Sequence, residues 1–290
     1  MDRNLTIILP SYRSKKLILS HLKSLSKNYK IIVIENSYDI SLEKIIKNKY
    51  KNVEVYLKKN IGYGRAVNFA AKKVKTKFFL VMNPDAKIYK NTLKNLIKYS
   101  KKLKNFGAVG PIYENQKNKF KKKLVKVNKL VSAAMLINTK TFLKIKGYDE
   151  NFFLYYEDDD FFLKCNLKKL DIYNVTNSFI KHNKSKVVKK TLNLHSTTFS
   201  NFKERNSTLV VGGWHGQWSK FYFYRKNSGY LSALMKCLPK NLLNLFQIFI
   251  YIFLNPAEAK YKYYKFEGFV TSLLGLPSYK RSIYDLKNLR

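Results

Sequence analysis

The first 110 residues alternate between short apolar runs and segments with helical spacing, and this alternation constrains the fold more than any other feature. The apolar runs, which we predict to be buried strands, are residues 5–9, 31–34, 53–57, 78–82 and 108–109. The segments between them predict helices over residues 15–26, 41–48, 65–74 and 91–103. Such alternation is typical of an α/β fold with a mostly parallel sheet and helices on both faces.

The second half of the chain is less regular. Residues 131–137 predict another strand, Asn138 is placed to cap a helix over residues 139–145, and a further helix is expected over residues 157–167. The lysine-dense residues 115–129 predict a loop or an exposed hairpin. We expect a first domain over residues 1–228, with a helical region over residues 229–290.

Polar clusters follow four of the predicted strands. They are Pro10-Ser11-Tyr12, Glu35-Asn36-Ser37, Asn60-Ile61-Gly62 and Asn83-Pro84-Asp85. Ligands bind beyond the carboxyl ends of the strands in sheets of this type. The sequence therefore predicts a ligand site at this edge.

The net charge of +39 is large, with 57 Lys and Arg residues against 18 Asp and Glu. Only seven of the 57 are arginine, the residue that forks onto phosphate and guanine. Lys, Asn, Ile, Tyr and Phe are abundant together, as expected of an AT-rich coding sequence. We attribute the charge mainly to this bias, then to an anionic membrane or anionic substrates, and expect no specific nucleic-acid binding.

The cysteines and the N-terminus favour a cytoplasmic protein. Cys165 and Cys237 are too few for a disulfide framework and are expected to be reduced thiols. The N-terminus lacks the apolar run and the cleavage site of a signal peptide. No apolar run reaches about 18 residues, so we expect no simple membrane span.

The cluster at residues 83–85 and the glycines that follow Asn60 each have two interpretations, one as a ligand site and one as a turn of the backbone. Asp85, after a strand, is placed to hold a divalent cation against phosphates, although Asx-Pro-Asp is also a common turn. Gly62 and Gly64 allow close backbone approach to a ligand, and Arg65 is placed to meet phosphate. The glycine spacing fits neither a dinucleotide fingerprint nor a P-loop.

Four consecutive carboxylates, Glu157-Asp158-Asp159-Asp160, form the strongest isolated feature. A helix N-terminus offsets part of their mutual repulsion, which is the structural interpretation. The apolar approach through residues 152–156 favours a position at the edge of a pocket, where a carboxylate acts as general base or metal partner. His21 is expected to be structural, and the absence of a Gly-x-Ser-x-Gly motif leaves acyl transfer without support.

The order of these motifs resembles family 2 of the inverting glycosyltransferases, with the Rossmann-like GT-A fold, over about residues 5–230. The similarity is greatest to the bacterial rhamnosyl- and galactofuranosyl-type branch. Five blocks match in order: Pro10-Ser11-Tyr12, Glu35-Asn36-Ser37-Tyr38-Asp39, Asn60-Ile61-Gly62-Tyr63-Gly64, Asn83-Pro84-Asp85, and Gly147-Tyr148-Asp149-Glu150 with the acidic run. The resemblance implies a nucleotide-sugar donor, UDP- or dTDP-linked, and Mg²⁺ or Mn²⁺.

The resemblance also implies roles for individual residues. Asp158 matches the catalytic base, with Glu157 and Asp160 as its supports, although the run leaves this assignment ambiguous by one position. Asp85 matches the metal ligand, and His182 stands where related enzymes place a histidine near the metal. The residues implied in nucleotide and donor binding are Pro10, Ser11, Tyr12, Glu35, Asn60, Gly62, Arg65 and Asn83.

The C-terminal third suggests a membrane-facing element. Residues 214–226 are aromatic and basic, which indicates a packed aromatic helix, an acceptor site or an interfacial belt. Residues 241–256 are apolar, short for a span, and flanked by lysines. We expect peripheral association with the anionic inner face of the cell membrane, which suits a glycan or lipid-linked oligosaccharide acceptor, and a homo-oligomer is an open alternative.

Two rival functions compete with this hypothesis. A sugar-nucleotide nucleotidyltransferase would carry a Gly-rich loop after the first strand, where this chain has Pro10-Ser11-Tyr12-Arg13. A basic, non-catalytic protein that binds membrane or nucleic acid would gain nothing from clustered carboxylates. A steep salt dependence of nucleic-acid binding would favour the second rival.

Overall fold

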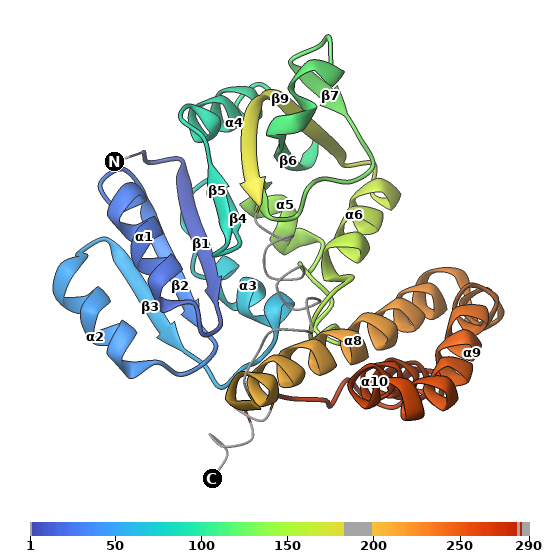
Figure 1. Ribbon diagram of the computed structural model, residues 1–290. Helices are drawn as coiled ribbons and strands as arrows, with labels where there is room; N and C mark the ends of the chain where they lie inside the picture. The colour runs from blue at the N-terminus through green and yellow to red at the C-terminus, as the bar shows by residue number, and fades with distance from the viewer. Residues whose placement is uncertain (1, 183–198, 283–284, 286–290) are drawn as a thin grey trace. The chain divides into compact units, whose positions relative to one another are not determined.

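The computed structural model describes residues 2–182, 199–282 and 285. The chain forms two compact units (Figure 1). The first unit comprises Met1–Asp149 and Asp158–Val187, and the second comprises Glu150–Glu157 and Val188–Arg290. The predicted boundary at residue 228 coincides with the end of a helix inside the second unit, and as a statement about independent domains it stays a prediction.

The first unit is built on one nine-stranded sheet (Figure 1). Its strands follow the order β3-β2-β1-β4-β8-β6-β9-β5, with β7 paired to β9 beside this path. The strands are β1 (Leu5–Ser11), β2 (Lys30–Glu35), β3 (Val53–Leu57), β4 (Phe78–Met82), β5 (Ala86–Ile88), β6 (Phe106–Tyr113), β7 (Leu124–Lys126), β8 (Ala134–Asn138) and β9 (Asp171–His182).

The sheet is mixed, whereas the sequence predicts a mostly parallel one. The strands β3, β2, β1 and β4 run parallel, as the strand–helix alternation predicts. Beyond β4 the pattern changes, because β8 lies antiparallel between β4 and β6. The β5 and β7 strands also pair antiparallel with β9, whereas β6 and β9 pair parallel. The predicted site therefore involves both the parallel strands β1, β2 and β4 and the end of β9.

Helices cover both faces of this sheet, as predicted. One core cluster packs α1, α2 and α4 against the sheet, and a second cluster packs α3, α5 and α6 against the other face. The helices of the first unit are α1 (Lys15–Leu25), α2 (Ile40–Lys49), α3 (Tyr63–Ala71), α4 (Thr92–Ser100), the 3₁₀ helix η1 (Glu114–Lys119), α5 (Thr139–Lys144) and α6 (Glu157–Leu167).

Side-chain alternation along the strands explains this two-faced core. In β1, Ile7 and Leu9 belong to the cluster beneath α1, whereas Ile8 between them belongs to the cluster beneath α3. The same division separates Phe78 from Phe79 at the start of β4. Because successive side chains of a strand point to opposite faces, an unbroken apolar run fills both cores at once.

The sequence missed three strands, β5, β7 and β9. The 115–129 segment, predicted as a loop or an exposed hairpin, contains η1 and the short strand β7. Strand β9 mixes buried and exposed residues without a strict alternation, and its pairing with β6 shifts register, so no local period marks it. The position of β9 matters for the predicted site, because it brings His182 next to β5.

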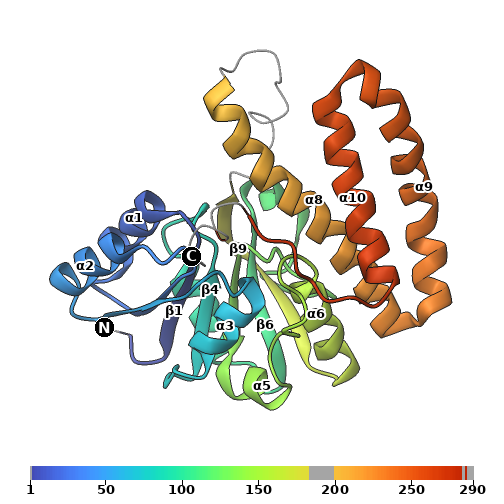
Figure 2. The ribbon, with the colours of Figure 1, turned by 90° about the horizontal axis from the view of Figure 1, so that it is seen from below.

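The second unit is helical. It contains α8 (Phe199–Ser228), α9 (Tyr230–Leu254) and α10 (Pro256–Leu273), which pack against one another, and α9 and α10 lie side by side (Figure 2). The aromatic segment 214–226 lies within α8, where Trp214, Trp218 and Phe221 are buried. This burial confirms a packed aromatic helix for those three residues.

Helix α9 corrects one expectation about membrane spans. The sequence predicts that no apolar run reaches about 18 residues, yet α9 is long and apolar enough to cross a membrane by length and composition. The difference arises because the helix continues through Lys236, Pro239 and Lys240, which interrupt the apolar run without ending the helix. Length and composition alone do not distinguish a span from a surface helix.

Candidate functional site

Glu35 lies at the carboxyl end of β2, beside Ser11 at the end of β1. The two residues are directly opposite in the parallel register. Ser11 Oγ donates to one carboxylate oxygen of Glu35, and the backbone amide of Ser37 donates to the other at 2.8 Å. Glu35 is almost fully buried and hydrogen-bonded through both oxygens, so its position is fixed.

The next polar loop is tied to the same edge through Asn36. The backbone amide of Asn60 donates to the carbonyl of Asn36 at 2.9 Å, and Asn36 Nδ2 donates to the carbonyl of Gly62 at 3.3 Å. Gly62 has φ = 87°, which a residue with a Cβ adopts only with strain. The Oδ1 atom of Asn36 is buried and has no hydrogen-bond partner in the part of the chain that the structure describes, which makes it an acceptor for a ligand.

The turn after β4 carries Asn83 and Asp85 and is held from two sides. Tyr63, the first residue of α3, donates its hydroxyl to Asn83 Oδ1 at 3.0 Å. His21 on α1 contacts the carbonyl of Pro84 at 2.8 Å, a contact that ties this turn to the helix, and its structural role stays a prediction. Burial lowers the pKa of His21, which favours the neutral imidazole that donates this bond.

Asp85 lies next to His182. The two are brought together because Ala86 in β5 is opposite His182 at the end of β9. His182 Nε2 is 3.1 Å from Asp85 Oδ1, the imidazole is buried, and the Asp85 side chain is 36% exposed. A carboxylate oxygen and an imidazole nitrogen are ligand types that Mn²⁺ accepts, so Asp85 and His182 are residues that could hold a divalent cation.

The first turn of α6 carries Asp158. Ser132, which precedes β8, donates its hydroxyl to Asp158 Oδ2. The carbonyl of the neighbouring Ala133 accepts a hydrogen bond from the backbone amide of Asn83 at 2.9 Å. Asp158 is thus connected through residues 132–133 to the turn that carries Asp85.

The other acidic residues of the run have different environments. Asp160 is buried and lies 3.4 Å from Lys164 Nζ, one turn later in α6. Asp159 is partly exposed and 3.7 Å from Lys129 Nζ. Burial and the Asp158 carboxylate raise the pKa of Asp159. Asp160 therefore pairs within α6, and Glu157, which is buried, groups with the second unit.

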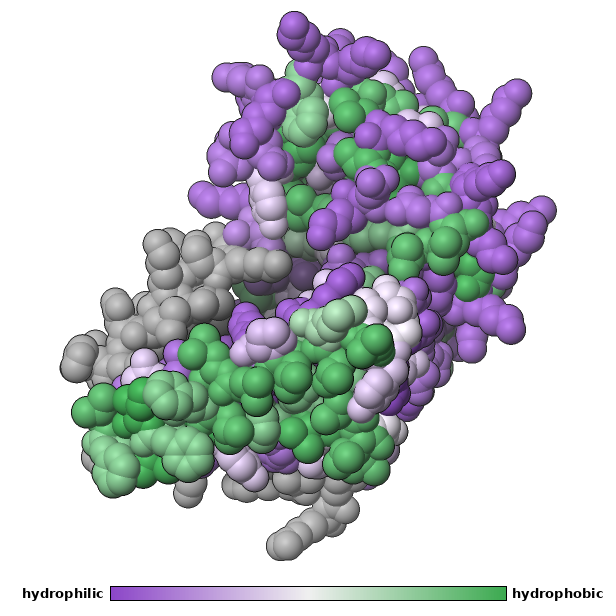
Figure 3. All heavy atoms as spheres, turned by 90° about the vertical axis from the view of Figure 1, so that its right-hand side faces the viewer, coloured by the Kyte–Doolittle hydropathy of each residue, from purple (hydrophilic) through white to green (hydrophobic). Residues whose placement is uncertain are grey.

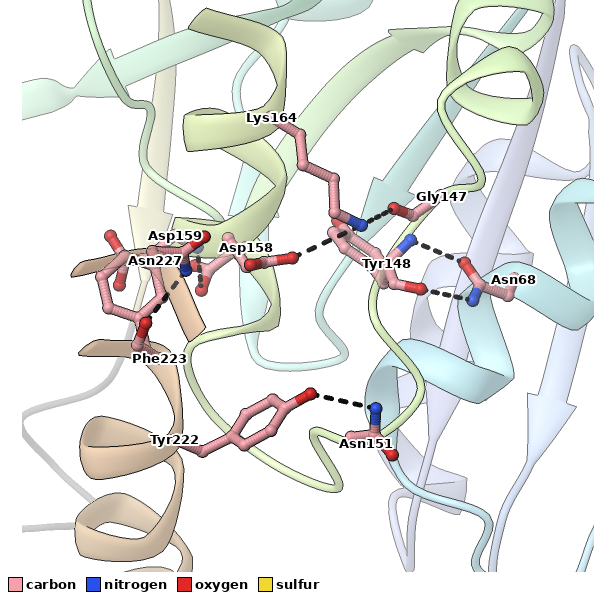
Figure 4. Close-up of polar contacts among 11 residues, drawn as sticks. Asn68, Gly147, Tyr148, Asn151, Asp158, Asp159, Lys164, Tyr222, Phe223 and Asn227 are labelled. Atoms are coloured by element: carbon pink, nitrogen blue, oxygen red, sulfur yellow. Dashed lines mark hydrogen bonds and ion pairs between the residues drawn. The ribbon is translucent and has the colours of Figure 1, made fainter. Parts of the chain in front are cut away.

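A polar clamp holds the loop before the acidic run. Asn68 of α3 accepts from the Tyr148 amide at 3.0 Å and donates to its carbonyl at 2.9 Å (Figure 4). Lys164 donates to the carbonyl of Gly147 at 2.9 Å (Figure 4). A Cβ on Gly147 would lie 2.4 Å from Asn68 Oδ1, so the tight turn requires glycine. The clamp joins α3, the Gly147 turn and α6 within the first unit.

Most of the predicted site residues lie at one edge of the sheet. Ser11, Glu35, Asn60, Gly62, Asn83, Asp85, His182 and Asp158 are linked by the contacts described above. Pro10 is buried within β1, Tyr12 follows that strand, and Arg65 is exposed on α3. Their roles, like those of the linked residues, stay predictions.

Sequence reasoning missed four residues that hold this edge. They are Ser37, Asn36, Tyr63 and Ser132, each of which bonds a predicted site residue or its backbone. Asn36 and Ser37 could have been predicted as site residues, because both belong to the polar cluster after β2. Ser132 carries no signal in the sequence, since its contact joins positions 26 residues apart.

A family model matches more than half of this chain. Residues 6–173 match the family model described as Glycosyl transferase family 2. This match covers more than half of the chain and all of the site except His182. No curated protein matches the chain.

Solved structures share the fold. Residues 1–349 of TarS from S. aureus match with a TM-score of 0.53 and 17% identity, over 94% of this chain and 92% of that one. The same TarS fragment has been solved with UDP-GlcNAc and with UDP. GalNAc-T7 with UDP, GalNAc and Mn²⁺ matches with a TM-score of 0.54 and 13% identity, over 78% of this chain and 51% of that one. This chain thus spans about half of GalNAc-T7.

Proposed function

The chain belongs to glycosyl transferase family 2 and is a glycosyltransferase with a GT-A-like fold, and from that premise we propose its reaction. It transfers a sugar from a UDP- or dTDP-linked donor to an acceptor hydroxyl, with inversion at the anomeric carbon. The observation that carries this proposal is the connected edge of the sheet. Glu35, Asp85 and Asp158 are held there by short contacts from different elements.

The donor end of the site is assigned to Ser11, Glu35 and the Asn60–Gly62 loop. Glu35 accepts from Ser11 and Ser37, so its carboxylate is oriented before a ligand arrives. The buried Asn36 Oδ1 offers an acceptor to a ribose hydroxyl or a base N–H. UDP-containing complexes of TarS and GalNAc-T7 support a uridine nucleotide.

Asp85 and His182 would hold a divalent cation, Mn²⁺ or Mg²⁺. When bound, the ion supplies positive charge against the diphosphate leaving group. Asp85 offers a carboxylate that is partly open to solvent, and His182 lies 3.1 Å away. The GalNAc-T7 structure with Mn²⁺ supports this choice of metal.

Asp158 acts as the general base. Its carboxylate accepts the proton of the acceptor hydroxyl while that oxygen forms a bond to the anomeric carbon and the bond from this carbon to the diphosphate oxygen breaks. Ser132 orients this carboxylate, which lies in the first turn of α6. Asp160 and Lys164 position α6, and Glu157 supports its first turn.

The acceptor is a cell-surface glycan or a lipid-linked oligosaccharide, and the transferred sugar is a hexose or a rhamnosyl- or galactofuranosyl-type residue. This choice is supported by the order of the sequence motifs and by the lysine-rich composition. The enzyme works at the inner face of the cell membrane. A nucleotidyltransferase and a non-catalytic basic binder are the rivals that the following experiment removes.

Thermal unfolding with UDP, dTDP and GDP, each with and without Mn²⁺, tests the donor site. A ligand at about 100 times its dissociation constant adds about 2.7 kcal/mol, which raises the midpoint by a few degrees. We expect a metal-dependent shift with UDP or dTDP that Asp85→Ala abolishes. The matched control is Glu43→Ala, which removes a carboxylate from α2.

The outcomes separate the proposal from its rivals. A shift in the Glu43→Ala control together with its loss in Asp85→Ala supports the metal and donor assignment. Absence of a shift with any nucleotide would contradict it and favour a non-catalytic binder. Release of diphosphate from a nucleoside triphosphate with a sugar phosphate would identify a nucleotidyltransferase instead.

A further inference from the structure

Helix α9 exposes large apolar side chains along one side. We call this the apolar face of α9, and it comprises Leu231, Met235, Leu242, Leu243, Phe246, Phe249, Ile250, Ile252, Phe253 and Leu254. Phe249 is 63% exposed and Phe253 is 88% exposed. Figure 3 shows a broad hydrophobic area on the side of the molecule where α9 lies. Such an area marks an interaction surface rather than a collection of single exposed residues.

The opposite side of α9 is small and polar. Its buried residues, Ala233, Cys237, Asn241 and Asn244, recur at helical spacing. Asn241 Nδ2 donates to Gln217 Oε1 of α8 at 3.3 Å, and Asn244 Nδ2 donates to Asn241 Oδ1 at 3.3 Å. The fully buried positions of α9 are therefore small or polar, whereas its phenylalanines at 246, 249 and 253 are exposed.

This arrangement is the reverse of a helix on the surface of a protein in water, which turns its apolar side inward. Burial of the apolar face would be favourable against an apolar medium or an apolar surface outside the protein. We infer that the apolar face of α9 is a docking surface for an anionic lipid bilayer, with α9 lying in the plane of the membrane interface.

Charge favours a membrane over a second copy of the chain. Lys236 and Lys240 are exposed on α9, and Lys260 is exposed near the start of α10. Anionic headgroups attract such lysines. A second copy would instead bring two chains of net charge +39 together, which electrostatic repulsion disfavours.

The geometry of α9 and α10 favours lying on the membrane over crossing it. The strongly apolar part, residues 242–254, is about 20 Å long at about 1.5 Å per residue, against a hydrocarbon core of about 30 Å. Asn255 then caps α10, accepting from the amide of Glu258 at 3.2 Å, and α10 packs back along α9. A spanning α9 would carry Glu258 and Lys260 into or across the bilayer, which is costly.

Vesicle co-sedimentation of the full chain tests this inference. The vesicles are phosphatidylcholine alone and phosphatidylcholine with phosphatidylglycerol. The variant is the triple substitution Phe246→Gln, Phe249→Gln and Phe253→Gln. The control is the triple substitution Leu17→Gln, Ile40→Gln and Leu143→Gln, which changes three exposed apolar residues of the first unit.

We expect the wild type and the control to bind the anionic vesicles, with weaker binding at high salt. The Phe triple variant should bind about 100-fold or more weakly with an unchanged unfolding midpoint, because three aromatic side chains no longer enter the interface. Equal binding by the Phe triple variant, or no binding by the wild type, would overturn the inference.

A fluorophore on Phe253→Cys separates the remaining alternatives. The native cysteines are both buried, so the introduced thiol is the accessible one. A blue shift on anionic vesicles, with quenching by shallow but not deep lipid-attached quenchers, supports an interfacial helix. Deep quenching would show a span, and a monomer–dimer change in sedimentation without vesicle binding would show a second copy. Either result contradicts the inference.

The inference is independent of the proposed reaction. Lipid binding is measured without nucleotide, metal or acceptor, and the Phe triple variant leaves the sheet edge unchanged. If vesicle binding were absent while nucleotide-dependent stabilisation was retained, the result would contradict the membrane inference and leave the proposed reaction intact. Failure of the nucleotide experiment would concern the first unit alone.

Discussion

The two units of this protein use apolar residues in opposite ways. In the first unit, the apolar runs of the parallel strands β1, β2 and β4 are buried between two layers of helices. In the second unit, α9 turns Asn241 and Asn244 inward and phenylalanines outward. The comparison teaches that an apolar pattern indicates which side of an element avoids water, whereas the partner of that side depends on the rest of the fold.

Substitution of the proposed base should produce the largest effect and separate the units most sharply. Asp158→Asn removes the proton acceptor but keeps the size of the side chain, so turnover should fall about 10²- to 10⁴-fold. The measurement is release of the nucleotide from the donor that gives a thermal shift. Vesicle binding through the second unit should be unchanged.

The matched control for this experiment is the neighbouring carboxylate. Asp159 is paired with the exposed Lys129, so Asp159→Asn should keep most of the activity. If instead Asp158→Asn were active and Asp159→Asn inactive, the base would be one residue further along α6. Comparable activity in both variants would show that neither Asp158 nor Asp159 is the base.

Truncation of one aromatic residue in each unit tests the comparison directly. Phe79 of β4 is fully buried, so Phe79→Ala should lower the free energy of unfolding by about 3–5 kcal/mol. Phe249→Ala in α9 should change it by about 0.5 kcal/mol or less, since the ring faces outward. Chemical denaturation measures both. A large loss from Phe249→Ala would mean that α9 is covered by protein in solution.

The pH dependence of stability should differ between the units because of His215. This buried residue contacts the carbonyl of Lys280 and Ser278 Oγ, and burial lowers its pKa to about 4. Below about pH 6.5 the unfolded chain therefore binds a proton that the folded chain does not. The free energy of unfolding should fall by about 3 kcal/mol from pH 7 to pH 4.

Tryptophan fluorescence reports this effect, because Trp214 and Trp218 are the two tryptophans of the chain and both lie in α8. The variant His215→Gln should flatten the dependence between pH 6.5 and pH 4, whatever its stability at pH 7. Identical slopes in the variant and the wild type would assign the acid sensitivity to other groups.

A smaller loss of stability than that from Phe79→Ala or from acid is expected in the polar interior of the second unit. Asn241 is buried and bonds Gln217, Asn244 and the Cys237 carbonyl. Asn241→Ala should lower the free energy of unfolding by about 1–3 kcal/mol, because buried amide groups lose partners. Denaturation followed by tryptophan fluorescence measures it. Stabilisation by this substitution would show that the polar contacts do not hold α9 to α8.

Much of the fold could be predicted from local patterns. The strand at 78–82 was placed at its observed bounds, and Asn138 caps α5 through the amide of Thr141, as expected. These elements are marked by runs and caps that depend on neighbouring residues alone. The strand β9 was missed because its pairing, and not its sequence period, makes it a strand.

The candidate site was less predictable than the fold. Motif order points to Glu35, Asp85 and Asp158, and in the structure they contact Ser11, His182 and Ser132, respectively. The residues that orient them were not predictable in the same way. Ser132 and Tyr63 lie 26 and 20 positions from the residues they bond, and no local pattern records such contacts.

By itself the sequence determined the alternation of strands and helices, the carboxyl-end clusters and the family, because each rests on spacing along the chain. The tertiary structure alone decided which strand lies beside which, that His182 reaches Asp85, and that Ser132 holds Asp158. It also decided that α9 turns its amides inward. The physical reason is that hydrogen bonds and burial depend on distance in space, and chain folding brings together residues that no local period relates.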